Sequence, residues 1–311
     1  MLMTYSQRVK NFLCEKSWES FKENGGDRAR YFLYGILLFS GEFGFDGIRL
    51  KCENSNILEV CAYVLINCFD ANISITERKK GEKTSYTILV NKEDVKKVTD
   101  ALGYAAEDIS VYRIKNKPDG DCRQYFLRGV FVACGNIRDP QKSYHLELST
   151  SHKMLSEELC ALFGEAGMDI RVTMRRSYYV LYCKDSESIE DFLMLLGAES
   201  FAYDVINTRI EKNIINNVNR VNNFESANLN KTIDASTISL SAIAYLREQG
   251  VFESLPEQLK ETARLREENP ELTLAELGLL FERKISKSGV SHRLNKIITA
   301  AREYSDYTLF V

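Results

Sequence analysis

Two short segments decide the fold of the first two thirds of the chain: Leu33-Tyr34-Gly35-Ile36-Leu37-Leu38-Phe39-Ser40-Gly41 and Leu127-Arg128-Gly129-Val130-Phe131-Val132-Ala133-Cys134-Gly135. Each is apolar on nearly every side, and each has a glycine six residues before the glycine that ends it. A helix that is apolar all round must be buried, and an internal glycine lets another backbone approach closely. We therefore predict that the two segments are helices that pack against each other.

The same order of elements follows both segments. Alternation of apolar and polar residues predicts strands, then a helix, then a hairpin and a last helix after each of them. Gly35 and Gly129 are 94 residues apart, and Ile73 and Ile170 are 97 residues apart. An offset that nearly holds across five elements indicates a duplicated domain. We predict an α+β fold built from a duplicated αββαββα unit with a pseudo-twofold axis.

Three segments are expected along the chain. The duplicated unit takes residues 1–200, with halves of about 1–104 and 120–200 joined by a connector. Residues 201–235 are rich in asparagine, a poor helix former whose amides need hydrogen-bond partners. They are either a polar linker or an arm that offers amides and Arg220 to DNA.

Residues 236–311 are predicted to form an all-α domain. A capping box at Thr273 and Glu276 starts a short helix, and a tight turn separates it from a final helix at about 287–304. The apolar residues of that final helix recur at the spacing of a packed face. A short capped helix, a tight turn and a longer basic helix make a helix-turn-helix, in which the second helix enters the major groove of DNA.

The outward side chains of the final helix are the main candidates for DNA contact. Between Arg283 and Arg302 there are six Lys or Arg residues and no acidic residue. Such side chains bind phosphates, and Ser, His and Asn can also bind base edges. An ordinary basic surface helix is the alternative. The predicted DNA-binding residues are Arg283, Lys284, Lys287, Ser288, Ser291, His292, Arg293, Asn295, Lys296 and Arg302.

The predicted strands leave one face of each sheet polar. A curved sheet with basic and hydroxyl side chains on one side can lie in a groove of DNA, but a solvated antiparallel sheet has the same alternation. Residues 1–200 hold 27 Lys and Arg against 29 Asp and Glu, which does not favour DNA binding there. The further candidates on these faces are Arg49, Lys51, Arg78, Arg171 and Arg175, with Ser74, Thr76, His145 and Thr173 beside them.

Composition limits the remaining classes. The formal net charge of −3 argues against a wholly basic nucleic-acid binder, so DNA contact must come from local patches. No apolar run reaches the roughly 18 residues that span a bilayer, and we expect a cytosolic protein without membrane contact. The eight cysteines form no CxxC pair and are expected to be buried reduced thiols, with neither metal nor cofactor.

The two glycine-containing segments resemble the signature helices of LAGLIDADG homing endonucleases. In that family the helices pack at a pseudo-twofold axis beneath a saddle-shaped sheet, and the eighth position of each motif is an acid that binds the catalytic metal. Here those positions are Ser40 and Cys134. Mg²⁺ needs oxygen ligands, and carboxylates supply them. The resemblance therefore implies a nuclease scaffold without catalytic residues.

The whole chain is similar to the WhiA family of bacterial regulators. That resemblance implies a non-enzymatic, sequence-specific regulator of transcription, bound to promoter DNA in the nucleoid and linked to cell division and sporulation, with a protein partner in either process. The alternatives are an active metal-dependent homing endonuclease, and an interaction platform that contacts DNA only through its C-terminal domain. The resemblance is carried by Leu127 to Phe131, Ser143 to Glu147, Asn219 to Thr232 and Lys284 to Leu294.

Overall fold

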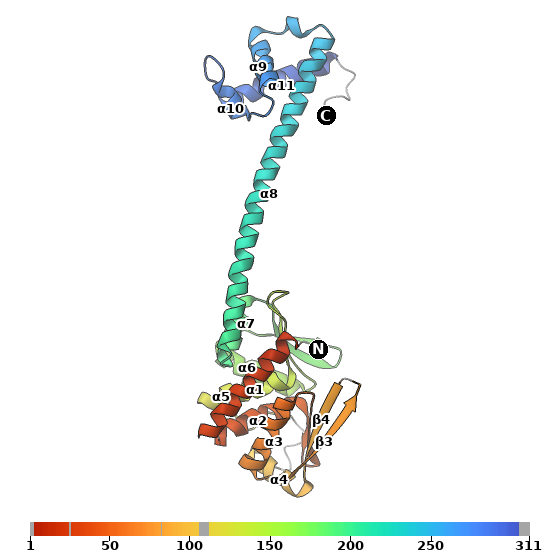
Figure 1. Ribbon diagram of the computed structural model, residues 1–311, viewed down its shortest axis with the longest axis vertical. Helices are drawn as coiled ribbons and strands as arrows, with labels where there is room; N and C mark the ends of the chain where they lie inside the picture. The colour runs from red at the N-terminus through yellow and green to blue at the C-terminus, as the bar shows by residue number, and fades with distance from the viewer. Residues whose placement is uncertain (1–2, 25, 82, 106–111, 305–311) are drawn as a thin grey trace. The chain divides into compact units, whose positions relative to one another are not determined.

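Two buried helices, α2 (Gly26–Ser40) and α5 (Gly120–Cys134), lie at the centre of the first part of the computed structural model (Figure 1). The chain divides into two units, Met1–Lys212 and Asn213–Val311, and each unit is described by itself. The structure describes residues 3–24, 26–81, 83–105 and 112–304, and of residues 23, 24, 83 and 228–232 only the backbone. Part of the predicted connector, residues 106–111, lies outside the described residues, as do residues 305–311.

The central helices approach each other at their glycines. A Cβ atom on Gly35 would lie 2.3 Å from the carbonyl oxygen of Phe126, and one on Gly129 would lie 2.0 Å from that of Phe32. Glycine alone leaves room for such an approach. Residues 32 and 126, like residues 35 and 129, differ by 94, so an internal twofold exchanges the two contacts. The predicted pairing of the two segments is confirmed.

Each half of the first unit repeats one order of elements, as the sequence predicted. Helix α1 (Tyr5–Asn24) precedes the first half and packs against both central helices. The first half continues from α2 with β1 (Glu42–Gly44), β2 (Gly47–Cys52), α3 (Ser55–Phe69), β3 (Ile73–Lys80), β4 (Lys83–Val90) and α4 (Lys92–Ala101). The second continues from α5 with β5 (Gly135–Ile137), β6 (Leu146–Thr150), α6 (Lys153–Glu165), β7 (Arg171–Arg175), β8 (Tyr178–Cys183) and α7 (Ser186–Leu195).

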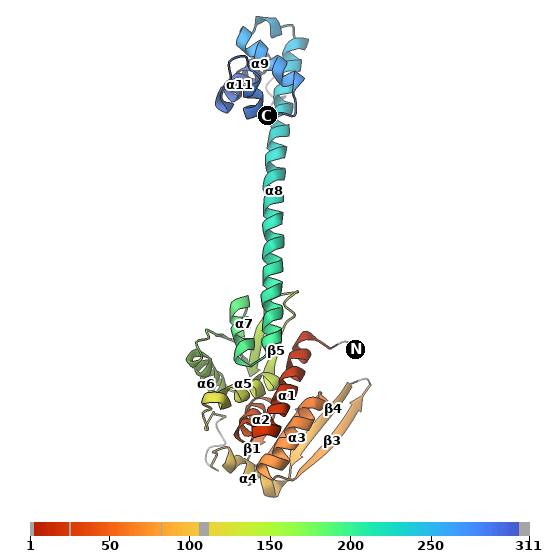
Figure 2. The same ribbon diagram turned by 60° about the vertical axis from the view of Figure 1, so that its left-hand side comes forward.

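Two four-stranded antiparallel sheets have matching topologies. Their strand orders are β1-β2-β4-β3 and β5-β6-β8-β7. Figure 2 shows β3 and β4 as a long hairpin beside α3. One face of each sheet packs on the helices, and its side chains, such as Leu50, Ile88, Leu148 and Leu181, are buried in the core. The duplicated αββαββα architecture is therefore present in the structure.

The strand registers place the predicted polar residues on the other face of each sheet. In the first sheet Lys51 pairs with Thr87, and Thr87 pairs with Thr76. In the second sheet Tyr182 pairs with Arg171 on one side and with Glu147 on the other. Paired residues and alternate residues share a face. The same faces therefore carry Arg49, Ser74 and Arg78 in the first sheet and His145, Thr173 and Arg175 in the second.

The asparagine-rich segment is helical. It lies within α8 (Glu199–Glu248), a helix of 50 residues that crosses the boundary between the two units. A polar linker or arm was expected here, because asparagine is a poor helix former. Each asparagine costs at most about 0.7 kcal/mol relative to alanine in a helix, and anchored ends offset that cost. Val205 is buried in the first unit, and Ile243 and Leu246 are buried in the second.

The second unit is all helical. After α8 it contains a 3-10 turn, η2 (Phe252–Ser254), and the helices α9 (Glu257–Glu268), α10 (Leu274–Leu279) and α11 (Lys287–Tyr304). Its core joins residues from α8, α9, α10 and α11, and Phe252 and Phe281 pack within it. Among the described residues no helix is both long enough and apolar enough to cross a bilayer.

A buried arginine fixes the loop that leads into α10. Arg266 is 2% exposed, and its Nη1 atom donates hydrogen bonds to the carbonyl oxygens of Asn269, Pro270 and Leu272, at 3.2, 3.3 and 2.8 Å. Burial lowers the pKa of Arg266 from its ordinary value, but a guanidinium remains charged in proteins. The buried guanidinium of Arg266 therefore holds the loop before α10 in place, and with it the orientation of α10 and of the turn that follows.

Candidate nucleic-acid interface

Helix α10 and the turn that follows it determine the position of α11 in the second unit. The predicted capping box is confirmed, since the Thr273 hydroxyl accepts from the Glu276 amide while the Glu276 carboxylate accepts from the Thr273 amide. The amide of Ile285 donates to the Gly278 carbonyl oxygen at 3.1 Å and closes the turn. A Cβ atom on Gly278 would lie 2.3 Å from the Ile285 carbonyl oxygen, so the turn requires glycine.

The amino end of α11 is capped and basic. The Gly289 amide donates to the Ser286 hydroxyl at 3.2 Å, and the Val290 amide donates to the Ser286 carbonyl oxygen at 3.0 Å. The first turn contains Lys287 and no acidic residue. A helix amino end with free amide groups and a positive dipole attracts phosphate.

One face of α11 is buried and the opposite face is open. Val290, Leu294, Ile297 and Ala301 lie in the core, as their spacing predicted. Ser288, His292, Asn295 and Thr299 follow one another at intervals of four, three and four residues on the opposite side, and all are exposed. Lys287 and Lys296 flank this row and are also exposed, while Ser291 is half-buried. The open face thus combines hydroxyl, imidazole, amide and ammonium groups over several helical turns.

Arg293 lies apart from this face. Its guanidinium is 5.2 Å from the centre of the Phe281 ring, and its Nη1 atom is 3.8 Å from a carboxylate oxygen of Glu261 on α9. Its side chain is only 21% exposed. Because successive helical residues differ by about 100°, Arg293 points sideways into the unit. Arg293 therefore packs between α11 and α9, apart from the open face of α11 on which it was predicted to lie.

The other predicted cations lie at the two ends of α11. Arg283 and Lys284 are exposed in the turn before the helix, and Arg302 is exposed in its last turn. Arg302 also interacts with another group of the protein, so it is not a free cation. The structure thus brings Lys287, Ser288, His292, Asn295 and Lys296 together on one surface and leaves Arg283 and Lys284 beside it.

Two of the predicted cations on the sheet faces are paired with carboxylates of the protein. Arg49 forms an ion pair with Glu42 at 3.0 Å, and Arg175 lies 3.5 Å from Glu147, which also accepts from His145. Hydrogen bonds from His145 and Asn136 and the nearby positive charges outweigh the effect of burial and lower the pKa of Glu147. For Lys51, Arg78 and Arg171 no ion-pair partner is found among the residues that the structure describes.

The two motif positions that hold metal ligands in LAGLIDADG nucleases do not fit a metal here. The Ser40 hydroxyl donates back to the Ile36 carbonyl oxygen at 2.8 Å, and the Cys134 thiol donates to the Val130 carbonyl oxygen at 3.3 Å. Burial raises the pKa of Cys134 to about 12, so the thiol stays neutral near pH 7. Neither group offers the anionic oxygen that Mg²⁺ binds.

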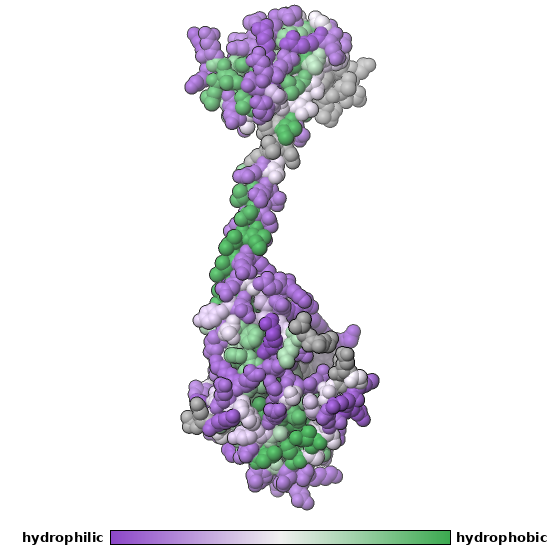
Figure 3. All heavy atoms as spheres, viewed as in Figure 1, coloured by the Kyte–Doolittle hydropathy of each residue, from purple (hydrophilic) through white to green (hydrophobic). Residues whose placement is uncertain are grey.

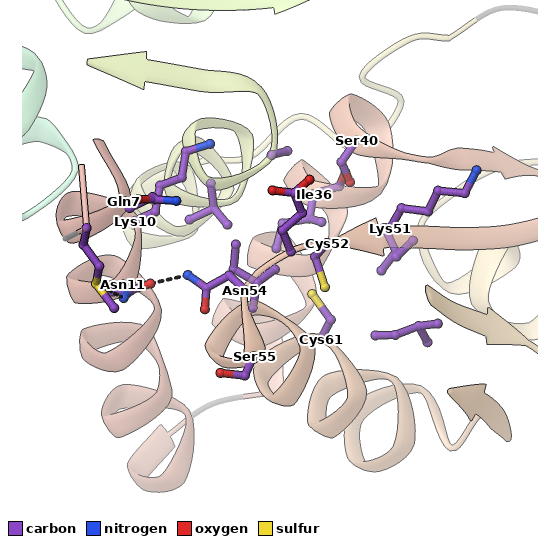
Figure 4. A pocket seen from close by; sticks show the side chains of 17 residues that line it. Gln7, Lys10, Asn11, Ile36, Ser40, Lys51, Cys52, Asn54, Ser55 and Cys61 are labelled. Atoms are coloured by element: carbon purple, nitrogen blue, oxygen red, sulfur yellow. Dashed lines mark hydrogen bonds between the residues drawn. The ribbon is translucent and has the colours of Figure 1, made fainter. Parts of the chain in front are cut away.

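The side chain of Lys10 lies near the two motif positions, Ser40 and Cys134. Lys10 on α1 and Ser40 line one cavity of about 540 Å³, with the hydrogen-bonded pair Asn11 and Asn54 (Figure 4). The Lys10 ammonium is 5.9 Å from the centre of the Phe131 ring at the end of α5, and Cys134 is among the groups that influence its ionisation. Burial lowers the pKa of Lys10. An ammonium group at this place is stabilised by the carboxyl ends of the helices, and it repels a divalent metal ion.

Lys10 and Ser286 were not among the residues predicted from the sequence. No motif contains Lys10, because it comes from a helix that precedes the repeat. Ser286 carried a usable signal, since serine is a preferred residue immediately before a helix.

Two family models match the chain. "WhiA LAGLIDADG-like domain" matches residues 123–215, and "WhiA C-terminal HTH domain" matches residues 218–301. The probable cell division protein WhiA of Clostridium novyi (strain NT) is 33% identical over 316 residues, which cover 97% of this chain and 98% of that protein. That of Clostridium tetani (strain Massachusetts / E88) is 32% identical over 318 residues, with the same coverage.

A solved structure shares the fold. The crystal structure of full-length DUF199/WhiA from Thermatoga maritima matches with a TM-score of 0.55 and 24% identity, covering 98% of this chain and 100% of that chain. Taken with the central helix pair and the α10–α11 turn, these findings define a helix-turn-helix protein that carries a degenerate LAGLIDADG-like domain. The chain belongs to the WhiA family, whose members named above are probable cell division proteins.

Proposed function

We propose that the chain is a sequence-specific, double-stranded DNA-binding regulator of transcription that acts in cell division and does not cut DNA. The open face of α11 is the single observation that carries this proposal. Lys287, Ser288, His292, Asn295 and Lys296 are all exposed on one surface, while the opposite side of the helix is fixed in the core. A helix held this way can present the same side chains to base edges along the major groove.

The roles of the other candidates follow from their partners. Arg283, Lys284 and Arg302 add phosphate contacts at the ends of α11, with Ser291 at its edge. On the sheet faces Lys51, Arg78 and Arg171 add further contacts with DNA phosphates. Arg49 and Arg175 do not, because each of them pairs with a carboxylate of the protein. We propose that the protein is nucleoid-associated. Sporulation and a protein partner in transcription or division are further expectations that the family resemblance supplies.

Incubating the full chain with supercoiled plasmid and Mg²⁺ tests both parts of this proposal. We expect a shift in electrophoretic mobility that salt weakens, with no conversion of the plasmid to nicked or linear forms. Nicking that depends on the metal would contradict the proposed loss of nuclease chemistry and favour the endonuclease alternative. A plasmid that is neither shifted nor cut would contradict DNA binding itself.

The Lys10 ammonium should limit any attempt to restore a metal site. In Ser40→Asp with Cys134→Asp the two carboxylates would face this cation, and we expect Mn²⁺ to bind weakly because the ammonium neutralises one of them. Adding Lys10→Met should tighten Mn²⁺ binding about tenfold or more, as measured by paramagnetic resonance of free Mn²⁺. Adding Lys22→Met, at the far end of α1, is the matched control and should leave the affinity unchanged. Equal Mn²⁺ affinities in the two triple variants would show that the Lys10 ammonium does not weaken metal binding at this site.

A further inference from the structure

An apolar stripe runs along the first half of α8 where no described element covers it (Figure 3). Tyr203, Ile210, Ile214, Val221 and Phe224 form the stripe, Ile215 and Val218 lie beside it, and the exposed fractions of all seven lie between 51% and 69%. Side chains of this size are seldom left so open when they gather along one line. The stripe therefore needs a partner.

The spacing of the stripe is that of a coiled coil. Positions 203, 207, 210, 214, 217, 221 and 224 alternate steps of four and three residues, which is the 3.5-residue repeat of paired helices. Five of the seven are the apolar residues of the stripe, and the other two are Asn207 and Asn217. Asparagine at isolated core positions is a device that fixes register and the number of helices at some expense of stability. The repeat covers three heptads, roughly 33 Å of helix.

The residues by which α8 packs into each unit are not those of the stripe. In the first unit Ala202, Val205 and Thr208 are the buried residues of the helix, and they lie outside the repeat. In the second unit the core takes Ala242, Ile243 and Leu246, beyond the end of the stripe. Neither core therefore uses the side chains of the stripe.

The charges beside the stripe suit a second copy of the chain. In the heptad, Arg220 precedes the core position 221, and Glu225 follows the core position 224. In a parallel pair of identical helices these flanking positions meet across the seam, so Arg220 of one chain faces Glu225 of the other, twice by symmetry. In an antiparallel pair they would not meet. No ion pair is found for either side chain among the residues that the structure describes.

We propose that the stripe is a dimerisation seam, in which α8 pairs in parallel with α8 of a second copy of this chain. This assigns Arg220 to the contact between chains, whereas the sequence suggested a DNA contact. A homodimer would carry two copies of α11 and would read two half-sites of DNA.

Sedimentation equilibrium of the full chain without DNA tests the proposal. We expect a reversible, concentration-dependent change from one chain to two. Val221→Lys with Phe224→Lys should raise the dissociation constant of the dimer by a factor of about 100 or more, because both lysines would enter the seam. Asn216→Lys with Asn223→Lys adds the same charges on the outer side of α8 and should leave the constant within about threefold. Circular dichroism checks that both variants keep the helix.

Charge exchange tests the pairing and its direction. Arg220→Glu and Glu225→Arg should each weaken the dimer about three- to tenfold, and the double variant should recover the original constant. The two positions are five residues apart and on opposite sides of the seam, so contact within one helix does not explain a rescue. A double variant as weak as the singles would overturn the parallel arrangement.

A chain that stays monomeric at every concentration would overturn the proposal as a whole. If the DNA affinity of that monomer also falls in Val221→Lys with Phe224→Lys but not in the outer control, the stripe is assigned to a contact with DNA.

Discussion

Replacing Gly129 by alanine should destabilise the first unit by at least about 3 kcal/mol. The added methyl group would lie 2.0 Å from the carbonyl oxygen of Phe32 and 3.2 Å from the Ile36 nitrogen. Both are backbone atoms of the facing helix, so no side-chain rotation relieves the overlap, and α2 and α5 must separate. Since these helices form the centre of both halves, their separation loosens the packing of the whole unit.

Thermal unfolding followed by circular dichroism measures this effect. For a unit of this size the loss corresponds to a fall in melting temperature of roughly 6–12 °C. Gly164 supplies the matched control, because it is also a helical glycine and a Cβ atom there would meet nothing within 4 Å. Gly164→Ala should change stability by less than about 1 kcal/mol. Similar melting temperatures for the two variants would contradict the close approach of the central helices.

The double substitution Lys287→Ala with Lys296→Ala should weaken DNA binding about 10- to 100-fold at physiological salt. Both ammonium groups are exposed beside the open face of α11 and are placed to contact phosphates. Each phosphate contact releases counterions, so the slope of log affinity against log salt should fall by about two units. Fluorescence anisotropy over a salt series measures affinity and slope together.

Lys260→Ala with Arg264→Ala is the control for net charge. Both side chains lie on α9 and pair with Glu257, at 3.6 and 3.8 Å, so they are engaged within the protein. This variant removes two positive charges from the same unit and should keep most of the affinity and slope. If the two double variants behave alike, binding depends on the charge of the unit and not on α11.

The fold could be predicted because its strongest signals are local and occur twice. Gly35 and Gly129 each mark a close helix approach, and the strand alternation around Lys51 and Arg171 gives the polar sheet face directly. The helix over the asparagine-rich segment was not predicted. Its stability comes from contacts at its ends, such as those of Val205 and Leu246, and helix propensity does not record them.

The positions of the candidate residues on α11 could be predicted from the sequence, except for two details. Periodicity separated the buried face of α11 from its open face, but Arg293 lies at the border between them, and only the position of Glu261 on α9 decides which way it points. Lys10 is distant in sequence from Cys134 and approaches it only through the packing of α1 on α5. Contacts between distant segments of this kind leave no trace in the spacing of residues.

The most direct test of the central claim is selection of DNA sequences by the full chain and by the variant Asn295→Ala. Asn295 is exposed in the middle of the open face, and an asparagine amide can bind adenine through two hydrogen bonds in the major groove. We expect the full chain to enrich one motif and the variant to lose preference at one base pair of that motif, by about 1–3 kcal/mol, while the preference at the other base pairs is kept. The same motif from both proteins, or no motif from either, would contradict it.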